Sequence, residues 1–400
     1  MYIQEAVYVQ SAGAEIMNKQ VNMSADNKKD KSVNIYVMTH KKFPEPDDKM
    51  YIPLQVGKKG KEDLGYLTDD TGDNISELNK YYSELTGVYW VYKNVSNIDY
   101  VGICHYRRYL VNSEGLVFTR AQLLELLQNY DIITSKCITL DNSYHYGFAD
   151  NHNIKDLDMT GQVIKEKYPD YYKLYLKLVN SNHTYFGNMC IMSKQLFDKY
   201  CKWLFDILFE VQKRINIDSY DDYHKRVFGF ISEFLLYLWV IKNNLKPLEC
   251  KVGLIGEKAE TGQVIKRVKE FIEDNNPEDA MQYIAGYKKK RPDITMEASD
   301  VSGDLRVLMQ IIAVAVIQKN ETGTCCIDKC RDADYLIHIY KFINSAVRRY
   351  RDGCENEKDI MILKRFNVSQ QAVRVSAQIF CRDKKVMRNV VDRIIRDITA

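Results

Sequence analysis

The sequence predicts an α/β domain followed by an all-α C-terminal domain. Short apolar segments typical of buried strands alternate with segments of helical periodicity up to about residue 255. Beyond about residue 258 the helical periodicity continues without a convincing strand. The length of 400 residues also exceeds one ordinary hydrophobic core. We therefore divide the chain into an N-terminal extension (1–32), an α/β domain (33–258) and a helical accessory domain (259–400).

The α/β domain is predicted to begin with a buried strand at residues 33–38, after a polar stretch at 24–32 that has the composition of a tether. A capping-box sequence that starts at Thr119 predicts a short helix at 123–127. The other expected strands cover 99–104, 130–134, 185–192 and 251–255, and the other expected helices cover 76–93, 168–179, 193–215 and 226–243.

Five helices are expected in the C-terminal domain, at 264–273, 277–290, 305–318, 334–351 and 368–379. Three cysteines, Cys325, Cys326 and Cys330, lie close together in this part of the sequence. No second pair of ligands follows at zinc spacing, so ordinary packing or surface thiols are favoured over a metal site.

Composition excludes several classes of protein. The 57 Lys and Arg against 54 Asp and Glu give a formal net charge of +3, which argues against nucleic acid as the main partner. The 10 cysteines are scattered, and several lie in apolar runs, which is typical of reduced thiols. No apolar run reaches the ~18–20 residues that span a bilayer, and the first residues lack a signal-peptide pattern. We therefore expect a cytoplasmic protein.

Polar and basic side chains follow the first two predicted strands. Open α/β sheets bind ligands at the carboxyl ends of their strands, and clustered arginines there favour an anion such as a diphosphate. The alternative is that the arginines pair with acidic residues of the 69–73 turn. The donor-binding candidates at the two strand ends are Thr39, His40, Lys41, His105, Tyr106, Arg107 and Arg108.

An acidic turn at residues 69–73 precedes the first predicted helix. Clustered carboxylates suit a hard divalent ion, but Asp, Gly and Asn are also ordinary turn and cap residues. Asp70, Asp73 and Asn74 are therefore candidates for donor binding, with a local capping role as the alternative.

An ordered set of motifs resembles a known family. In this order they resemble the DUF4422 type of bacterial glycosyltransferase, encoded in capsular and exopolysaccharide gene clusters, over about residues 33–255. The motifs are Asp70-Thr-Gly-Asp-Asn-Ile-Ser76, Glu84-Leu-Thr-Gly-Val-Tyr-Trp90, the run 102–109, Asn151-His-Asn-Ile-Lys-Asp-Leu-Asp158, Asn188-Met-Cys-Ile-Met192, Trp203-Leu-Phe-Asp206 and Arg226-Val-Phe-Gly-Phe-Ile-Ser-Glu233.

The resemblance implies a GT-A-like (Rossmann-like) nucleotide-sugar-binding domain. Such a domain would transfer a hexosyl group, with galactofuranosyl among the candidates, from a UDP-sugar to a glycan or lipid-linked oligosaccharide in surface polysaccharide synthesis. In that fold an Asp-x-Asp at the second strand edge usually holds a divalent metal, Mn or Mg, on the diphosphate. Here His105-Tyr-Arg107 occupies that place, and this departure puts metal dependence in doubt. Arg107 and Arg108 could supply the positive charge at the leaving group, with a divalent metal, Mn or Mg, as the alternative.

The acceptor hydroxyl needs a base, and Glu233 is the first candidate. It is a lone carboxylate in an apolar run, although a structural partnership with Arg226 is an equal alternative. Asp156 and Asp158 compete with it, because a loop placement would let them contact acceptor hydroxyls. We expect inversion of configuration, with retention as the alternative. The candidates for acceptor binding are Tyr146, His152 and Asn188.

The C-terminal domain suggests a different class of function. Residues 366–373 resemble the turn and second helix of a helix-turn-helix, and a basic tail follows at 382–396. Such short matches are common in helical proteins, so DNA binding is disfavoured. A basic tail also suits anionic lipid at the inner face of the plasma membrane. The alternative to an enzyme is a regulatory protein whose helical domain binds DNA or a partner.

Overall fold

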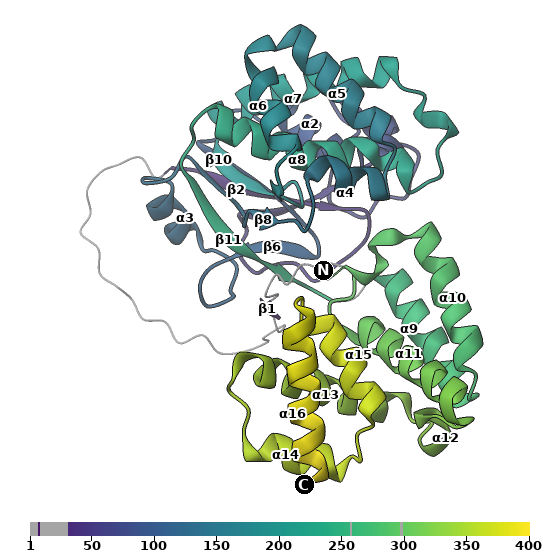
Figure 1. The fold of residues 1–400 in the computed structure, drawn as a ribbon. Helices are drawn as coiled ribbons and strands as arrows, with labels where there is room; N and C mark the ends of the chain where they lie inside the picture. Colours follow the sequence, from purple (N-terminus) through teal and green to yellow (C-terminus); the bar gives the residue numbers. More distant parts are fainter. Residues whose placement is uncertain (1–6, 9–30, 257, 297–298) are drawn as a thin grey trace. The chain divides into compact units, whose positions relative to one another are not determined.

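The computed structural model describes residues 7–8, 31–256, 258–296 and 299–400 (Figure 1). The chain divides into two compact units, Met1–Ile255 and Gly256–Ala400. Most of the stretch predicted to be a tether lies outside the described residues. The first unit is an α/β domain and the second is helical, as the sequence predicts at that level of detail.

Nine strands of the described residues form a mixed sheet at the centre of the first unit (Figure 1). Their order is β1-β11-β7-β10-β5-β2-β3-β4, and β6 pairs with both β5 and β11. β10 runs antiparallel to both of its neighbours, whereas β2, β3, β4 and β5 are parallel. The strands are β1 (Val7–Tyr8), β2 (Val33–Thr39), β3 (Tyr51–Gln55), β4 (Leu67–Thr68), β5 (Tyr100–His105), β6 (Arg108–Val111), β7 (Ile132–Ser135), β10 (Cys190–Ser193) and β11 (Pro247–Leu254). A separate small ribbon pairs β8 (Ile138–Thr139) with β9 (His183–Thr184).

The sheet is buried on both faces, and β2 shows how its sequence achieves this. Tyr36 and Met38 belong to the core on one face, and Ile35 and Val37 belong to the core on the other. A nearly continuous apolar run is what a strand covered on both sides requires. The buried strand predicted at 33–38 is therefore confirmed.

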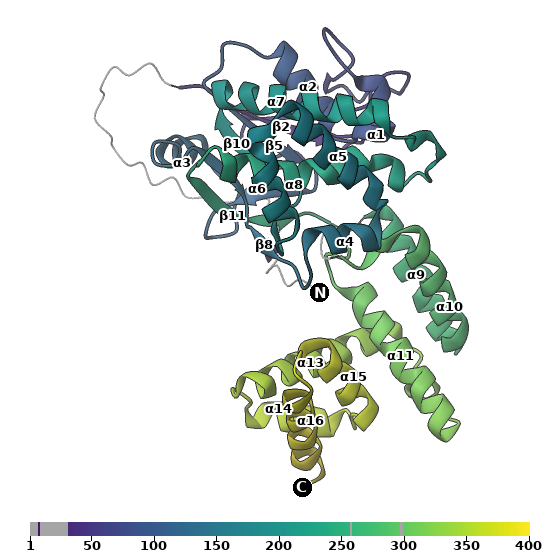
Figure 2. The same ribbon diagram turned by 45° about the horizontal axis from the view of Figure 1, so that its top comes forward.

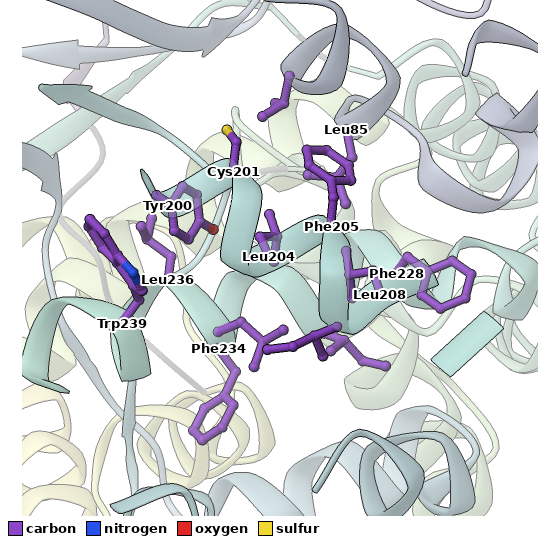
Figure 3. Packing of buried hydrophobic residues seen from close by; sticks show 14 of the residues in the cluster. Leu85, Tyr200, Cys201, Leu204, Phe205, Leu208, Phe228, Phe234, Leu236 and Trp239 are labelled. Atoms are coloured by element: carbon purple, nitrogen blue, oxygen red, sulfur yellow. The ribbon is translucent and has the colours of Figure 1, made fainter. Parts of the chain in front are cut away.

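Most helices of this unit cover one face of the sheet, and α3 packs on the other (Figures 1 and 2). The α7 and α8 side chains form the centre of the larger core with those of α2, as Figure 3 shows. α8 is apolar around almost its whole circumference, which suits a helix buried between neighbours. The helices are α1 (Asn79–Tyr82), α2 (Leu85–Asn94), α3 (Arg120–Leu126), α4 (Tyr144–Asn151), α5 (Ile154–Lys167), α6 (Pro169–Val179), α7 (Lys194–Arg214) and α8 (Val227–Lys242).

The helix predicted at 76–93 is broken. A 3₁₀ turn (Ser76–Leu78) and α1 end at Ser83, whose φ of +49° is left-handed, and α2 then starts anew. Such a φ is unfavourable for a side chain with a Cβ and ends a helix. The break places Glu84 at the start of α2 rather than inside a longer helix.

Other local predictions were wrong in instructive ways. The structure has two strands, β3 and β4, in the 43–73 stretch, where the sequence predicted none, and the predicted end of the second strand continues into β6. The strand predicted at 185–192 is confined to β10, because Gly187 (φ +97°) and Asn188 (φ +49°) interrupt it. The segment around Asp156, predicted to be a loop, forms α5.

The second unit contains helices and no strand among its described residues. All five predicted helices are present, and α12, α14 and α16 are additional. α15, the second helix of the resemblance to a helix-turn-helix, packs among α11, α13 and α16, with Ala372, Val373 and Ala377 buried. The helices are α9 (Ala259–Glu273), α10 (Pro277–Lys290), α11 (Asp304–Thr322), α12 (Cys326–Lys329), α13 (Ala333–Asp352), α14 (Glu357–Arg365), α15 (Gln370–Phe380) and α16 (Lys384–Thr399).

A buried amide network fixes the register of three of these helices. The side chains of Gln310 and Asn344 exchange two hydrogen bonds of 3.0 and 2.8 Å, and Ser376 Oγ donates to Asn344 Oδ1 at 2.6 Å. Buried polar groups are stable only when paired, so this network permits one arrangement of α11, α13 and α15. Within the described parts of the chain, no helix has the length and apolar character needed to cross a bilayer.

Candidate active site

The order of the strands reverses at β2 and β5, which pair in parallel so that their carboxyl ends lie side by side. The chain runs outward from β2 to β3 and β4, and then returns to form β5 on the other side of β2. In open α/β sheets, ligands bind where the strand order reverses in this way. Thr39 ends β2 and His105 ends β5, so the sequence-predicted strand ends meet at this point.

The end of β2 carries a group of rings and cations. The His40 and Tyr106 rings meet edge to face at 5.3 Å, and Lys41 Nζ lies 5.3 Å from the centre of the Tyr106 ring. Thr39 is buried, and its hydroxyl donates to the carbonyl oxygen of Lys41 at 2.5 Å. Thr39 therefore shapes this turn, while the two exposed or half-buried basic side chains remain at the surface.

Five ionisable side chains converge beside the end of β5, and we call them the charged cluster: Glu84, His105, Arg108, Arg226 and Glu233. They come from the start of α2, the end of β5, the start of β6, the residue before α8, and the second turn of α8. Each of them is half-buried, so each retains contact with solvent. Sequence positions that are up to 149 residues apart thus meet in one place.

Gly187 connects the members of this cluster. Its carbonyl oxygen lies 2.6 Å from His105 Nε2, and its N–H donates to Glu233 Oε1 at 2.8 Å. A Cβ at this position would lie 4.0 Å from Arg108 Nη1 and 3.0 Å from Met189 Cε. Because φ is +97°, only glycine adopts this conformation without strain.

Asn188 holds Glu84 in place. Its Nδ2 donates to Glu84 Oε1 at 2.7 Å and to the Gly229 carbonyl at 3.0 Å, and its Oδ1 accepts from Ser232 Oγ at 2.9 Å. The Asn188 side chain is buried and fully engaged by protein partners. In this structure its amide positions a carboxylate, and its predicted role at the acceptor stays a prediction.

The surroundings move the pKa values of the two carboxyl groups apart. Burial raises the pKa of Glu233 to about 8, with the Glu84 charge adding to the rise and Gly187, Arg108 and Arg226 opposing it. Burial also acts to raise the pKa of Glu84, but His105, the Asn188 amide and Arg226 outweigh it and leave that pKa below the ordinary value. Burial lowers the pKa of His105, and the Glu84 charge opposes this shift. Such a separation is typical of acid–base sites.

Neither Arg226 nor Glu84 was predicted from the sequence as a site residue. Arg226 was named only as a possible partner of Glu233, and Glu84 only within a family motif. Arg226 Nε donates to Ser83 Oγ at 3.0 Å, and its guanidinium lies 5.8 Å from the centre of the Phe230 ring. The His152 ring stacks on the same Phe230 ring, with the ring centres 4.1 Å apart. A cation and a carboxylate that each directly precede an apolar helix were the sequence signals for Arg226 and Glu84.

The two adjacent arginines have different surroundings. Arg107 Nε donates to the Ile255 carbonyl at 3.1 Å, and the Ile255 N–H donates back to the Arg107 carbonyl at 3.0 Å. Arg108 instead acts electrostatically on His105 and Glu233. The positive charge that we predicted from both residues is thus carried into the charged cluster by Arg108.

Asp156 and Asp158, the alternatives to Glu233 as the base, are not members of the charged cluster. Asp156 is buried at the start of α5, where Oδ1 accepts from Tyr220 at 2.9 Å, and burial raises its pKa. Asp158 is on the exposed side of α5 and lies 3.1 Å from His145 Nε2. Tyr146 is 54% exposed on α4, so its predicted role at the acceptor stays a prediction.

The acidic turn makes mainly local contacts. Asp69 is buried and accepts from the N–H groups of Gly57 and Lys58, which anchors the turn after β3. Asp73 pairs with Lys93 at 3.1 Å, and Asn74 caps the following turn through Ser76 N–H. These contacts match the capping alternative, and the predicted donor-binding role of Asp70, Asp73 and Asn74 stays a prediction.

The side chains at the second strand edge do not fit a divalent metal. His105 Nε2 contacts one carbonyl oxygen and Arg107 Nε donates to another, so the place of an Asp-x-Asp carries an imidazole and a guanidinium instead of carboxylate oxygens. Among the described residues, no group of three or more His, Cys, Asp and Glu side chains is arranged to hold a metal ion, and the cysteines of 325–330 form none.

A small void lies beneath Asn188, lined mainly by apolar side chains such as Ile103, Tyr200 and Leu204. Its volume of about 10 Å³ has room for about one water molecule, so it belongs to the core and holds no substrate.

A solved glycosyltransferase structure and a protein-family model are similar to this chain. The apo structure of WbbM, a bifunctional glycosyltransferase, matches with a TM-score of 0.52 and 29% sequence identity. The match covers 56% of this chain and 46% of that chain, so this chain spans less than half of that protein. No curated protein matches. A family model described as a domain of unknown function (DUF4422) matches residues 34–244, more than half of the chain, and the protein therefore belongs to the DUF4422 family.

Proposed function

We propose that the α/β unit is a GT-A-like glycosyltransferase. It transfers a hexosyl group, with galactofuranosyl among the candidates, from a UDP-sugar to a glycan or lipid-linked oligosaccharide in surface polysaccharide synthesis. The observation that carries the proposal is the charged cluster, in which two arginines and a carboxyl group of raised pKa meet at the carboxyl ends of β2 and β5. The likeness to a solved glycosyltransferase supports the same class of reaction.

The arginines have the chemistry to bind the donor diphosphate. Guanidinium groups bind phosphate oxygens bidentately, and a fixed positive charge stabilises a departing diphosphate without reorganisation. Arg108 and Arg226 supply this charge from two elements, one from the start of β6 and one from the residue before α8. The rings and cations of His40, Lys41 and Tyr106 are suited to the nucleotide.

Glu233 acts as the general base in the proposed reaction. The acceptor oxygen attacks the anomeric carbon and forms the new C–O bond as its proton passes to the Glu233 carboxylate. The bond between the anomeric carbon and the diphosphate oxygen breaks, and the electron pair leaves with UDP. A base with a pKa near 8 is strong enough to take this proton while a useful fraction is ionised at neutral pH. One displacement of this kind inverts the anomeric configuration.

A hydrolysis screen tests the proposal. The full chain is incubated with a panel of UDP-sugars, without acceptor and then with a synthetic glycan acceptor, and UDP release is measured with and without a chelator. We expect one donor to release UDP, faster with acceptor, and equally in chelator. No release from any donor would contradict the proposed transferase, and loss of release in chelator would contradict the role of the arginines in place of a metal.

A further inference from the structure

Glu84 is the member of the charged cluster to which the reaction above gives no role. It is half-buried at the N-cap of α2, and it lies close enough to Gly229 that a Cβ there would be 3.9 Å from its Oε1. The carboxylate therefore lies beside the first turns of both α2 and α8, whose N–H groups favour a negative charge.

A chain of hydrogen bonds through neighbouring residues fixes the position of the Glu84 carboxylate. Asn188 donates to it at 2.7 Å, and the Asn188 side chain is in turn held by Ser232 and the Gly229 carbonyl. Two left-handed residues with side chains, Ser83 (φ +49°) and Asn188 (φ +49°), flank this contact. Asparagine adopts a positive φ readily, whereas a positive φ is uncommon for serine, and uncommon conformations of this kind cluster at functional sites.

Besides the arginines and the base, the proposed reaction needs an anion that stabilises positive charge on the donor sugar. When the bond to a diphosphate breaks, negative charge grows on the leaving oxygens and positive charge grows on the anomeric carbon and ring oxygen. Arg108 and Arg226 are suited to stabilise the negative charge on the leaving oxygens. Glu233 becomes protonated in the proposed reaction, so it cannot stabilise the positive charge on the sugar. Glu84 is the remaining anion of the cluster, and it interacts with His105, Arg226 and Glu233.

We propose that the Glu84 carboxylate, mounted on Asn188, is a second catalytic group that stabilises the positive charge developing on the donor sugar. The inference rests on the proposed transferase function. It implies that Glu84 contributes in the transition state and opposes the binding of the anionic donor in the ground state, because a carboxylate repels the diphosphate. A residue of that kind lowers affinity for UDP while it raises turnover.

This opposition gives a test in two parts: UDP binding, which does not depend on knowing the donor sugar, and UDP release from the donor that the hydrolysis screen identifies. UDP binding to the full chain is measured by calorimetry for the wild type, Glu84→Gln and the control Glu125→Gln, whose carboxyl group is exposed on α3. We expect Glu84→Gln to bind UDP about 3- to 10-fold more tightly and to release UDP from the donor at least about 100-fold more slowly. Glu125→Gln should match the wild type in both measurements.

The outcomes separate the two proposals. If the wild type binds no UDP, the proposed function fails. If the wild type binds UDP but Glu84→Gln binds it equally or more weakly, or turns over normally, the role of Glu84 fails. Should Glu84→Gln not fold, Glu84→Asp replaces it. That variant keeps the charge but withdraws the carboxylate, so UDP affinity should stay within about twofold of the wild type while turnover falls, and unchanged turnover would overturn the inference.

Discussion

Replacing Glu233 by glutamine is expected to stabilise the α/β unit, by an amount that grows with pH. Burial raises the pKa of this carboxyl group from 4.5 to about 8 in the folded protein. The folded state therefore binds the proton more tightly than the unfolded state. The stability that depends on the protonated form is fully present below about pH 4.5 and is lost as the pH rises through about 8. Glutamine stays neutral, keeps an oxygen for the Gly187 N–H, and escapes this loss.

The size of the effect follows from the shift. Each pKa unit corresponds to about 1.4 kcal/mol, so a shift from 4.5 to about 8 sets an upper bound of about 5 kcal/mol above pH 8. Because Glu233 is half-buried and water reaches the cluster, we expect roughly half of that, about 2–3 kcal/mol. For a unit of this size that difference raises the unfolding temperature by about 5–10 °C. At pH 5 the two proteins should differ little.

Tryptophan fluorescence is suited to the measurement. The three tryptophans of the chain, Trp90, Trp203 and Trp239, all lie in helices of the α/β unit, so their emission reports unfolding of that unit. Thermal unfolding is followed at pH values from 5 to 9 for the wild type, Glu233→Gln and the exposed control Glu125→Gln. If Glu233→Gln is less stable than the wild type at pH 9, or if its gain in stability does not depend on pH, the raised pKa of Glu233 is contradicted.

Further substitutions test other parts of the structure. Gly187→Ala forces a side chain to φ +97° between two contacts of the cluster, so we expect a loss of about 1–3 kcal/mol in chemical denaturation together with lower turnover. Gly102→Ala would place a Cβ 2.9 and 3.0 Å from isoleucine side chains of the two neighbouring strands, and should cost about 1–3 kcal/mol in the same assay. Asn344→Ala leaves the amide of Gln310 buried without its partner, so the helical unit should lose about 2–3 kcal/mol by far-UV circular dichroism. Turnover should rise with pH and level off near pH 8, where Glu233 ionises, and a rate that falls between pH 6 and 8 would contradict its role as base.

The sequence predicted the features that depend on local pattern. The strand that becomes β2 was evident from its continuous apolar run, and the helix after Thr119 from its capping box, which the structure contains in full. The strand ends that carry His105 and Arg108 were predicted to be a donor site, because polar and basic residues directly follow an apolar strand, and in the structure both residues belong to the charged cluster. In each case neighbours in the chain determine the structure.

The composition of the cluster could not be predicted, because it depends on long-range packing. Adjacent arginines differ in role only because Arg107 meets the end of β11 while Arg108 starts β6, and sequence alone does not show that pairing. Glu84 was hidden by a predicted continuous helix that the left-handed Ser83 interrupts. The placement of Asp156 in a loop was an avoidable error, since apolar residues at helical spacing after it indicate α5.

The assignment of the charged cluster as the donor site is tested most directly by comparing two neighbouring arginines. UDP binding to the full chain is measured by calorimetry for the wild type, Arg108→Ala and Arg107→Ala. We predict that Arg108→Ala loses at least about 10-fold in affinity, because it removes a charged contact with the diphosphate. Arg107→Ala should keep its affinity within about twofold, because its guanidinium binds the Ile255 carbonyl and serves stability. Equal losses in both variants, or a loss confined to Arg107→Ala, would contradict the assignment of the charged cluster as the donor site.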